Sequence, residues 1–311
     1  MSTPDLLLDR RPDGERPLPP TEERLEASAE LDAKSSLEVL RLLNAEDRVA
    51  VEAVDAVLPQ LAGLVDLTAG RFRRGGTVHY FGAGTSGRLG VLDAAELLPT
   101  FNLEPGRVVG HIAGGAAALV NAVEDAEDSD AEGRAAAADL GPDDVAIGLA
   151  ASGNTPYVGG ALAVARAAGA HTALVSSNPH ADLAHLADTV IVLETGAEVL
   201  TGSTRLKAAT AEKLVLNGFS TALMVAVGRT WSNLMVSVVA TNDKLRHRTV
   251  RILADATGLQ PAAARQLLAS ADGELKTAIV AAVGGIEIDE ARRLIAEHGG
   301  SVRDALAEAS R

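Results

Sequence analysis

The chain has 311 residues, which is enough for one sizeable core and a smaller second domain. Lys and Arg number 28 against 42 Asp and Glu, and the formal net charge of -14 argues against nucleic acid or an anionic membrane as the main partner. The chain has no cysteine, so disulfides, thiolate nucleophiles and Cys-ligated metals are excluded.

Residues 1–22 combine prolines with mixed charge and predict a disordered lead-in. The first 23 residues lack the apolar stretch of a signal peptide, and no apolar window is long enough for a membrane span. A cytoplasmic protein is therefore expected. Residues 35–70 then predict a helix, because Leu37, Leu40 and Leu43 open an apolar spacing of three that continues at three and four.

Short apolar runs alternate with longer helical stretches in the middle of the chain. The runs lie at residues 77–81, 107–112, 144–150, 171–175 and 189–194, and most are bounded by Gly or Ser. Helical segments of about ten residues or more fit between most of them, as parallel strands require. The pattern predicts an α/β fold, with a parallel sheet covered by helices on both faces in three α-β-α layers.

The character of the sequence changes after about residue 246. The stretch 203–241 is expected to be largely helical, and short helical segments punctuated by glycines follow it. We expect a main domain at 23–245, with its core at about 68–231, and a small helical domain at 246–311.

Three expected strand ends carry small polar residues, at the edge where open parallel sheets bind ligands. In the first loop Gly84 allows close backbone approach, while Thr85 and Ser86 add hydroxyl donors at the start of a helix. The second loop places Ser152, Asn154 and Thr155 before a proline suited to a first helical turn.

The third loop places Ser203, Thr204 and Lys207 at the start of another expected helix. A capped helix start explains one such loop equally well, because Ser and Thr are common caps. Three loops together favour a phosphate site. The glycines at 82, 84 and 87 also fit the GxGxxG spacing of dinucleotide sites, but no acidic residue follows the next strand, which makes that reading weak.

Seven stretches between about residues 21 and 253 together form a specific pattern. They are YFGAGTSGRLGVLDAAELLPTF (80–101), IAGG (112–115), AVEDAEDS (122–129), ASGNTPYV (151–158), VSSNP (175–179), TGSTRLKAATAEKLVLNGFSTALM (201–224) and TNDKLRHRTVRIL (241–253). In this pattern the chain resembles the N-acetylmuramic acid 6-phosphate etherases, a family with the sugar-phosphate isomerase (SIS) fold. The chain departs from the family pattern at Leu97-Leu98, where Cys-Pro is common, and at Asn154, where many members have Arg.

The resemblance implies cleavage of the lactyl ether of N-acetylmuramic acid 6-phosphate, giving N-acetylglucosamine 6-phosphate and D-lactate by elimination and water addition. This chemistry needs two proton-transfer groups and no metal or redox cofactor. By alignment, Glu96 is the proton donor to lactate, and Glu127 matches the second catalytic glutamate, which we assign as the base at C2. A single SIS unit with long apolar helices at 203–241 suggests a homodimer, and the resemblance implies a site near the subunit interface.

Two other functions share this fold. An aldose-ketose isomerase of sugar phosphates also needs a base at C2 but no acid at C3. A sugar-phosphate sensor similar to the glucokinase regulatory protein needs no catalytic group, but that protein resembles a duplicated SIS arrangement on a longer chain. The single SIS unit and the two glutamates favour the etherase.

Overall fold

The computed structural model describes residues 18–240 and 243–311. Most of the expected disordered lead-in lies outside them. The part that is described is ordered, since Pro20–Glu22 form a 3-10 turn in which Thr21 is fully buried. The long helix α1 (Ser36–Arg73) follows, and Ser35 and Glu38 cap its start reciprocally, each accepting from the other's backbone N–H.

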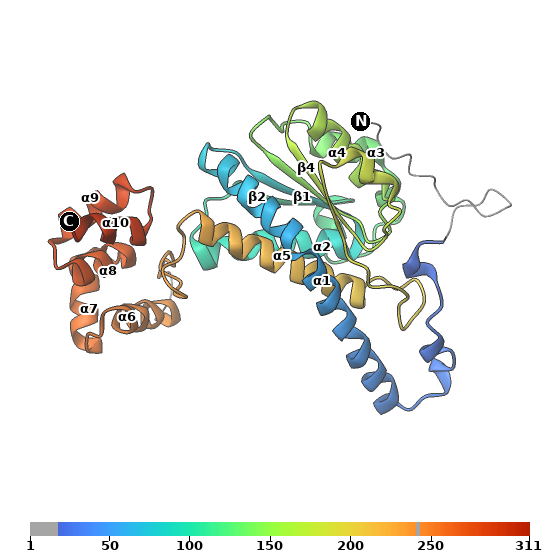
Figure 1. The fold of residues 1–311 in the computed structure, drawn as a ribbon, viewed down its shortest axis with the longest axis horizontal. Coiled ribbons are helices and arrows are strands. Elements are labelled where there is room, and N and C mark those ends of the chain that lie inside the picture. The colour runs from blue at the N-terminus through green and yellow to red at the C-terminus, as the bar shows by residue number, and fades with distance from the viewer. Residues whose placement is uncertain (1–17, 241–242) are drawn as a thin grey trace.

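Five strands of the described residues form one parallel sheet in the order β2-β1-β3-β4-β5 (Figure 1). Each strand lies within two residues of its predicted position. Their bounds are β1 (Val78–Gly82), β2 (Val108–Ile112), β3 (Val145–Leu149), β4 (His171–Ser176) and β5 (Thr189–Val192). The predicted parallel α/β fold is confirmed.

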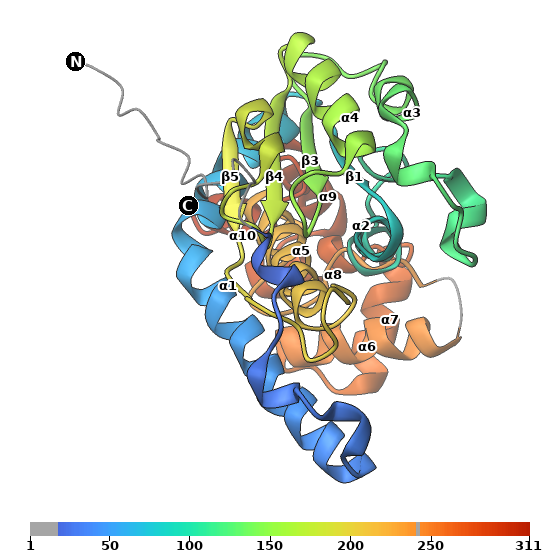
Figure 2. The ribbon, with the colours of Figure 1, turned by 90° about the vertical axis from the view of Figure 1, so that its right-hand side faces the viewer.

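Helices cover both faces of the sheet. Helices α1, α2 (Gly84–Phe101) and α5 (Lys207–Ala226) pack on one face, while α3 (Asp130–Ala136) and α4 (Pro156–Ala167) pack on the other (Figures 1 and 2). Phe219 and Met224 are buried in the first of the two resulting cores, and Val158 and Leu162 in the second. The positions of these helices therefore decide which side chains lie near the carboxyl ends of the strands.

The chain from 203 to 241 is less helical than its sequence suggests. Helix α5 ends at Ala226, and Gly228 follows with a φ of +75°, a conformation that favours glycine. Between this point and residue 240 the chain is irregular, yet Val236 and Val238 are buried. Their apolar character therefore serves packing against the C-terminal helices and not a continued helix.

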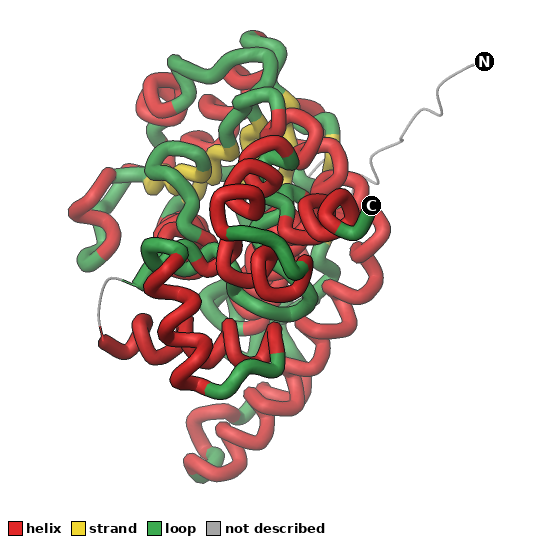
Figure 3. The backbone as a smooth tube through the Cα atoms, turned by 90° about the vertical axis from the view of Figure 1, so that its left-hand side faces the viewer, coloured by secondary structure: helices red, strands yellow, loops and turns green. Residues whose placement is uncertain are grey.

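The C-terminal helices form a cluster with its own core. The cluster lies apart from the sheet in Figure 1, and in Figure 3 it faces the viewer. The five helices of this cluster within residues 243–311 lie where short helical segments were predicted. They are α6 (Asp243–Thr257), α7 (Pro261–Ser270), α8 (Leu275–Gly284), α9 (Ile288–Glu297) and α10 (Val302–Ala309). Among all the described helices, none is long and apolar enough to cross a membrane.

The strand register sets the position of the candidate site. Gly82, the last residue of β1, lies opposite Ile112 at the end of β2 and Leu149 at the end of β3. The chain passes from β1 to one neighbour and then to the other, so β1 and β3 flank a topological switch point. The loops after these strands therefore begin level with one another at the edge where open α/β sheets bind ligands.

Candidate active site

The start of α2 is held close to the end of β1 by two glycines. A Cβ atom on Gly82 would lie 2.7 Å from the Gly87 nitrogen, and one on Gly87 would lie 2.6 Å from the Gly82 carbonyl oxygen. Gly84 has a φ of +53° and is exposed. Within the described residues no side chain caps this helix, so N–H groups in its first turn remain free to bind an anion.

The start of α4 is similarly uncapped. Thr155 is its N-cap residue, and no side-chain hydrogen bond caps the helix within residues 18–240 and 243–311; the predicted first-turn position of Pro156 is confirmed. The loop is tied to the chain after β4, where Asn178 Nδ2 donates to the Ser152 carbonyl at 2.9 Å. Asn154 Oδ1 accepts from the Asp182 backbone N–H at 2.9 Å, so this side chain already has a local role.

The start of α5 differs from the other two. The carboxylate of Glu198 accepts hydrogen bonds from the backbone N–H groups of Lys207 and Ala208, at 3.2 and 2.9 Å. These two N–H groups are therefore occupied and do not face a ligand. Ser203 and Thr204 lie half-buried in the turn just before the helix.

Glu127 lies beside the start of α2. It belongs to a short 3-10 turn, Ala126–Asp128, and lines a cavity of about 200 Å³ together with Gly84, Arg88 and Glu124. The Arg88 guanidinium donates to the carbonyl oxygens of Leu119 and Asn121, at 3.2 and 3.0 Å. Arg88 thus connects the segment before Glu127 to the start of α2. Its positively charged side chain also lines the cavity that contains Glu127.

Glu96 lies elsewhere in the same chain. It is exposed in the second half of α2, and it does not line the cavity of Glu127. Twelve residues separate it from Gly84 in the helix, which corresponds to about 18 Å along the helix axis. The fold of one chain therefore brings Gly84 and Glu127 together but leaves Glu96 apart from them.

Sequence reasoning missed two residues of this region. Arg88 was part of the first loop but was given no role. Glu212 of α5 accepts a hydrogen bond from Ser86 at 2.8 Å although 126 residues separate the two, and no local pattern reveals such a pair. Among the described residues, no group of three or more His, Cys, Asp or Glu is arranged to hold a metal ion.

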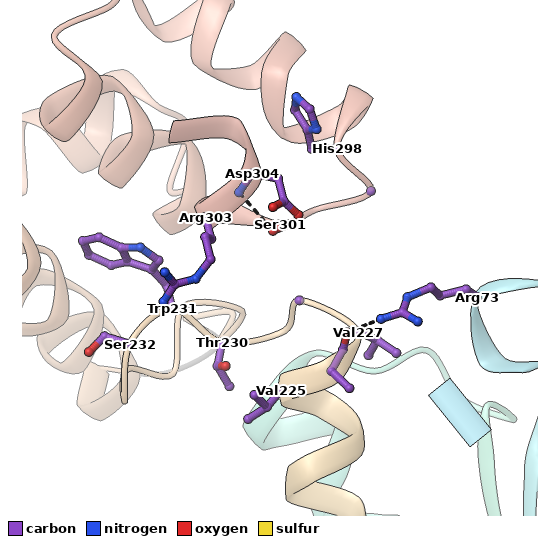
Figure 4. Close-up of a pocket in the computed structure, with 13 residues that line it drawn as sticks. Arg73, Val225, Val227, Thr230, Trp231, Ser232, His298, Ser301, Arg303 and Asp304 are labelled. Atoms are coloured by element: carbon purple, nitrogen blue, oxygen red, sulfur yellow. Dashed lines mark hydrogen bonds between the residues drawn. The ribbon is translucent and has the colours of Figure 1, made fainter. Parts of the chain in front are cut away.

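Another cavity, of about 410 Å³, lies where the ends of α1 and α5 meet the C-terminal helices (Figure 4). Its lining includes Arg73, Trp231 and Arg303, and Arg73 donates to the carbonyl of Ala226. None of the residues predicted for substrate binding or catalysis lines it. Because α1 ends just before β1 begins, this cavity lies toward the opposite edge of the sheet from the loops described above.

Comparison with known proteins agrees with this fold. Residues 60–166 match the model of the glucokinase regulatory protein N-terminal SIS domain. That stretch contains β1, β2, β3, α2 and α4, and hence the first two loops and the Glu127 turn.

Longer similarities are found with bacterial enzymes named N-acetylmuramic acid 6-phosphate etherase. The protein from Thermobifida fusca is 55% identical over 84% of this chain and 86% of its own length. The proteins from Streptomyces avermitilis and Pectobacterium atrosepticum are 51% and 49% identical, over 91% and 92% of this chain and 92% and 95% of their own lengths. With nearly the whole sequence matched at about half identity, the chain belongs to the N-acetylmuramic acid 6-phosphate etherase family.

Proposed function

We propose that this protein cleaves the D-lactyl ether of N-acetylmuramic acid 6-phosphate, with N-acetylglucosamine 6-phosphate and D-lactate as products. The observation that carries the proposal is the pairing of an uncapped helix start with a carboxylate in one cavity, Gly84 with Glu127. A helix start binds phosphate and a carboxylate removes protons, so this pairing suits a phosphorylated substrate that must lose a proton. The relatives' names supply the identity of the substrate.

Phosphate recognition is assigned to the first two loops. The uncapped starts of α2 and α4 follow β1 and β3 at the switch point, and we assign the hydroxyls of Thr85, Ser86 and Thr155 and the Ser152 side chain to the same phosphate. Ser203, Thr204 and Lys207 lie at the third loop, where Glu198 and Glu46 occupy the nearest donors. We assign this third loop to the rest of the sugar, away from the phosphate.

The chemistry follows from the substrate in its open aldehyde form. The hydrogen on C2 is then α to a carbonyl, and the exposed carboxylate of Glu127 removes it. The C3–O bond breaks as the C2=C3 double bond forms, and Glu96 gives a proton to the departing lactate oxygen. Water then adds to the double bond of the unsaturated aldehyde, with its hydroxyl on C3 and its proton on C2, which gives N-acetylglucosamine 6-phosphate in its open form.

Glu96 must then reach the substrate from a second copy of the chain. We infer a homodimer in which Glu96 of the partner subunit completes the cavity that holds Glu127. The surface beside Glu96 supports this arrangement, because Leu92, one turn earlier on the same face of α2, is 48% exposed. An exposed large apolar side chain at this position suits a subunit contact.

Lactate release tests the proposal. The wild type is expected to release D-lactate from N-acetylmuramic acid 6-phosphate, and in heavy-oxygen water the label is expected at C3 of the amino sugar and not in lactate. An aldose-ketose isomerase would release no lactate. Label in lactate would mean that water cleaves the ether on the lactyl side, which overturns the elimination mechanism.

The match to the glucokinase regulatory protein domain favours one second candidate, a sensor that binds sugar phosphates without turning them over. Binding of the substrate without lactate release would support that candidate. We also propose a role in the cytoplasm in recycling cell-wall amino sugars, because a sugar phosphate that carries several negative charges does not cross a bilayer unaided. Accumulation of N-acetylmuramic acid 6-phosphate in cells that lack the protein would support this role, and unchanged levels would contradict it.

A further inference from the structure

A buried carboxyl group lies directly behind the first loop. The hydroxyl of Ser86, in the first turn of α2, donates to Oε2 of Glu212 at 2.8 Å. Glu212 lies on α5 and is only 3% exposed. Its other oxygen, Oε1, is buried and has no hydrogen-bond partner among the described residues.

This environment favours the neutral form of the carboxyl group. Burial raises the pKa of Glu212 to about 7, and the hydrogen bond from Ser86 is the opposing influence. The charged groups on the packed helices have partners of their own: Lys207 of α5 pairs with Glu46 of α1, and the charge of Lys213 acts on Asp93 of α2. Glu212 is thus set to exchange a proton near neutral pH.

The protonation state of Glu212 decides what Ser86 can offer to a ligand. A hydroxyl has a single proton, and a fully ionised phosphate only accepts hydrogen bonds. While Glu212 is ionised, the Ser86 proton is directed to it, and an oxygen lone pair faces the loop. Once Glu212 is protonated, its own O–H can donate to Ser86 Oγ, and the Ser86 proton becomes free for a phosphate oxygen.

We propose that Glu212 is a positioning residue that takes up a proton when a sugar phosphate binds, so that Ser86 turns and donates its hydroxyl proton to the phosphate. The inference rests on the proposed function in one respect, that the phosphate lies at the start of α2. Neutralising Glu212 also removes a negative charge from behind the phosphate, which adds to the coupling.

The coupling between phosphate binding and protonation of Glu212 can be measured. At about pH 8 the phosphate is already fully ionised and free Glu212 is mostly ionised, so binding should take up about 0.9 proton per site. Between about pH 8 and 9 the dissociation constant of N-acetylglucosamine 6-phosphate should rise about tenfold, because each binding event must first protonate Glu212.

The experiment is calorimetric titration of the full-length protein with N-acetylglucosamine 6-phosphate, in buffers of different ionisation enthalpy, which reports the protons taken up. In Glu212→Gln the amide donates to Ser86 at any pH. This variant should bind with no proton uptake and with a nearly constant dissociation constant. Asp93→Asn is the matched control, since Asp93 is another buried carboxyl between α2 and α5, bonded to Ser220 at 2.9 Å. It should keep the wild-type proton uptake.

Each outcome either supports or overturns the proposed role of Glu212. Absence of proton uptake by the wild type, or equal uptake by wild type and Glu212→Gln, overturns the role of Glu212 even if lactate is released normally. Proton uptake by the wild type that is lost in Glu212→Gln supports the role, even if no lactate is released and the proposed function fails. If the wild type does not bind the sugar phosphate, both proposals are overturned.

Discussion

Lys207, at the start of α5, forms an ion pair with Glu46 of α1, with 2.5 Å between Nζ and Oε2. The lysine side chain is 4% exposed and the glutamate side chain 20%. A lysine predicted to belong to the phosphate site is therefore already neutralised by its own chain. The pair joins the third loop to the long N-terminal helix.

Breaking this pair should destabilise the fold. Glu46→Leu leaves a buried ammonium without a partner and should lower the free energy of unfolding by about 3 kcal/mol, measured by urea titration. The double variant Glu46→Leu/Lys207→Met should recover most of the loss, because two apolar side chains can replace a buried pair at little cost.

The exposed pair of Arg134 and Asp130 provides the control, with side chains 52% and 50% exposed. Arg134→Met should cost less than about 1 kcal/mol. If Glu46→Leu were as mild as this control, Lys207 would not depend on Glu46, and its assignment to the substrate would gain support.

The close approach of Gly82 and Gly87 makes a second prediction. Gly87→Ala places a Cβ atom 2.6 Å from the Gly82 carbonyl oxygen and 2.7 Å from Ile112. The helix start must shift, so we expect a loss of about 1–3 kcal/mol in unfolding free energy and weaker binding of N-acetylglucosamine 6-phosphate by calorimetry.

Gly63→Ala is the matched control for this substitution. Gly63 lies within α1 with no atom within 4 Å of an added Cβ, so the alanine should stabilise the protein by about 0.5–1 kcal/mol. Unchanged sugar-phosphate binding by Gly87→Ala would mean that the first loop does not hold the phosphate.

The sheet and the helical segments could be predicted from sequence because their signals are local. Apolar runs such as 77–81 end at glycines, and β1 ends within one residue of the predicted limit. The contacts of Ser86 with Glu212 and of Lys207 with Glu46 could not be predicted, since 126 and 161 residues separate the partners. The irregular chain at 227–240 was wrongly predicted as helical for a related reason, because an apolar residue such as Val236 that is buried among the C-terminal helices resembles helix periodicity.

The raised pKa of Glu212 also predicts how stability depends on pH. The folded pKa of about 7 exceeds the ordinary value of 4.5, so the folded state holds this proton more tightly than the unfolded state does. Wild-type stability should therefore fall as pH rises from about 4.5 to 7 and stay level above that. Glu212→Gln escapes this loss and should be more stable than wild type at about pH 8, by on the order of 3 kcal/mol.

Urea titrations of wild type and Glu212→Gln at several pH values check this prediction. The stability difference should shrink toward zero as pH falls toward about 4.5, since Glu212 is then protonated in both the folded and the unfolded protein. A difference that stays constant across the whole pH range would show that Glu212 does not titrate in the folded protein.

The separation of Glu96 from Glu127 within one chain predicts complementation between subunits. Glu96→Gln and Glu127→Gln should each lose at least about a hundredfold in lactate release, because each removes a proton-transfer group. When the two variants are mixed and allowed to exchange subunits, half of the dimers become mixed, and one of their two sites contains both wild-type glutamates. About a quarter of the wild-type activity should return.

A double variant mixed with wild type is the control. Its mixed dimers contain no complete site, so only the dimers of two wild-type subunits should be active. If the exchanged single variants stayed inactive while capture through a tag on one variant confirmed mixed dimers, both glutamates would have to act within the same subunit, and the helix α2 that carries Glu96 would have to move toward Glu127.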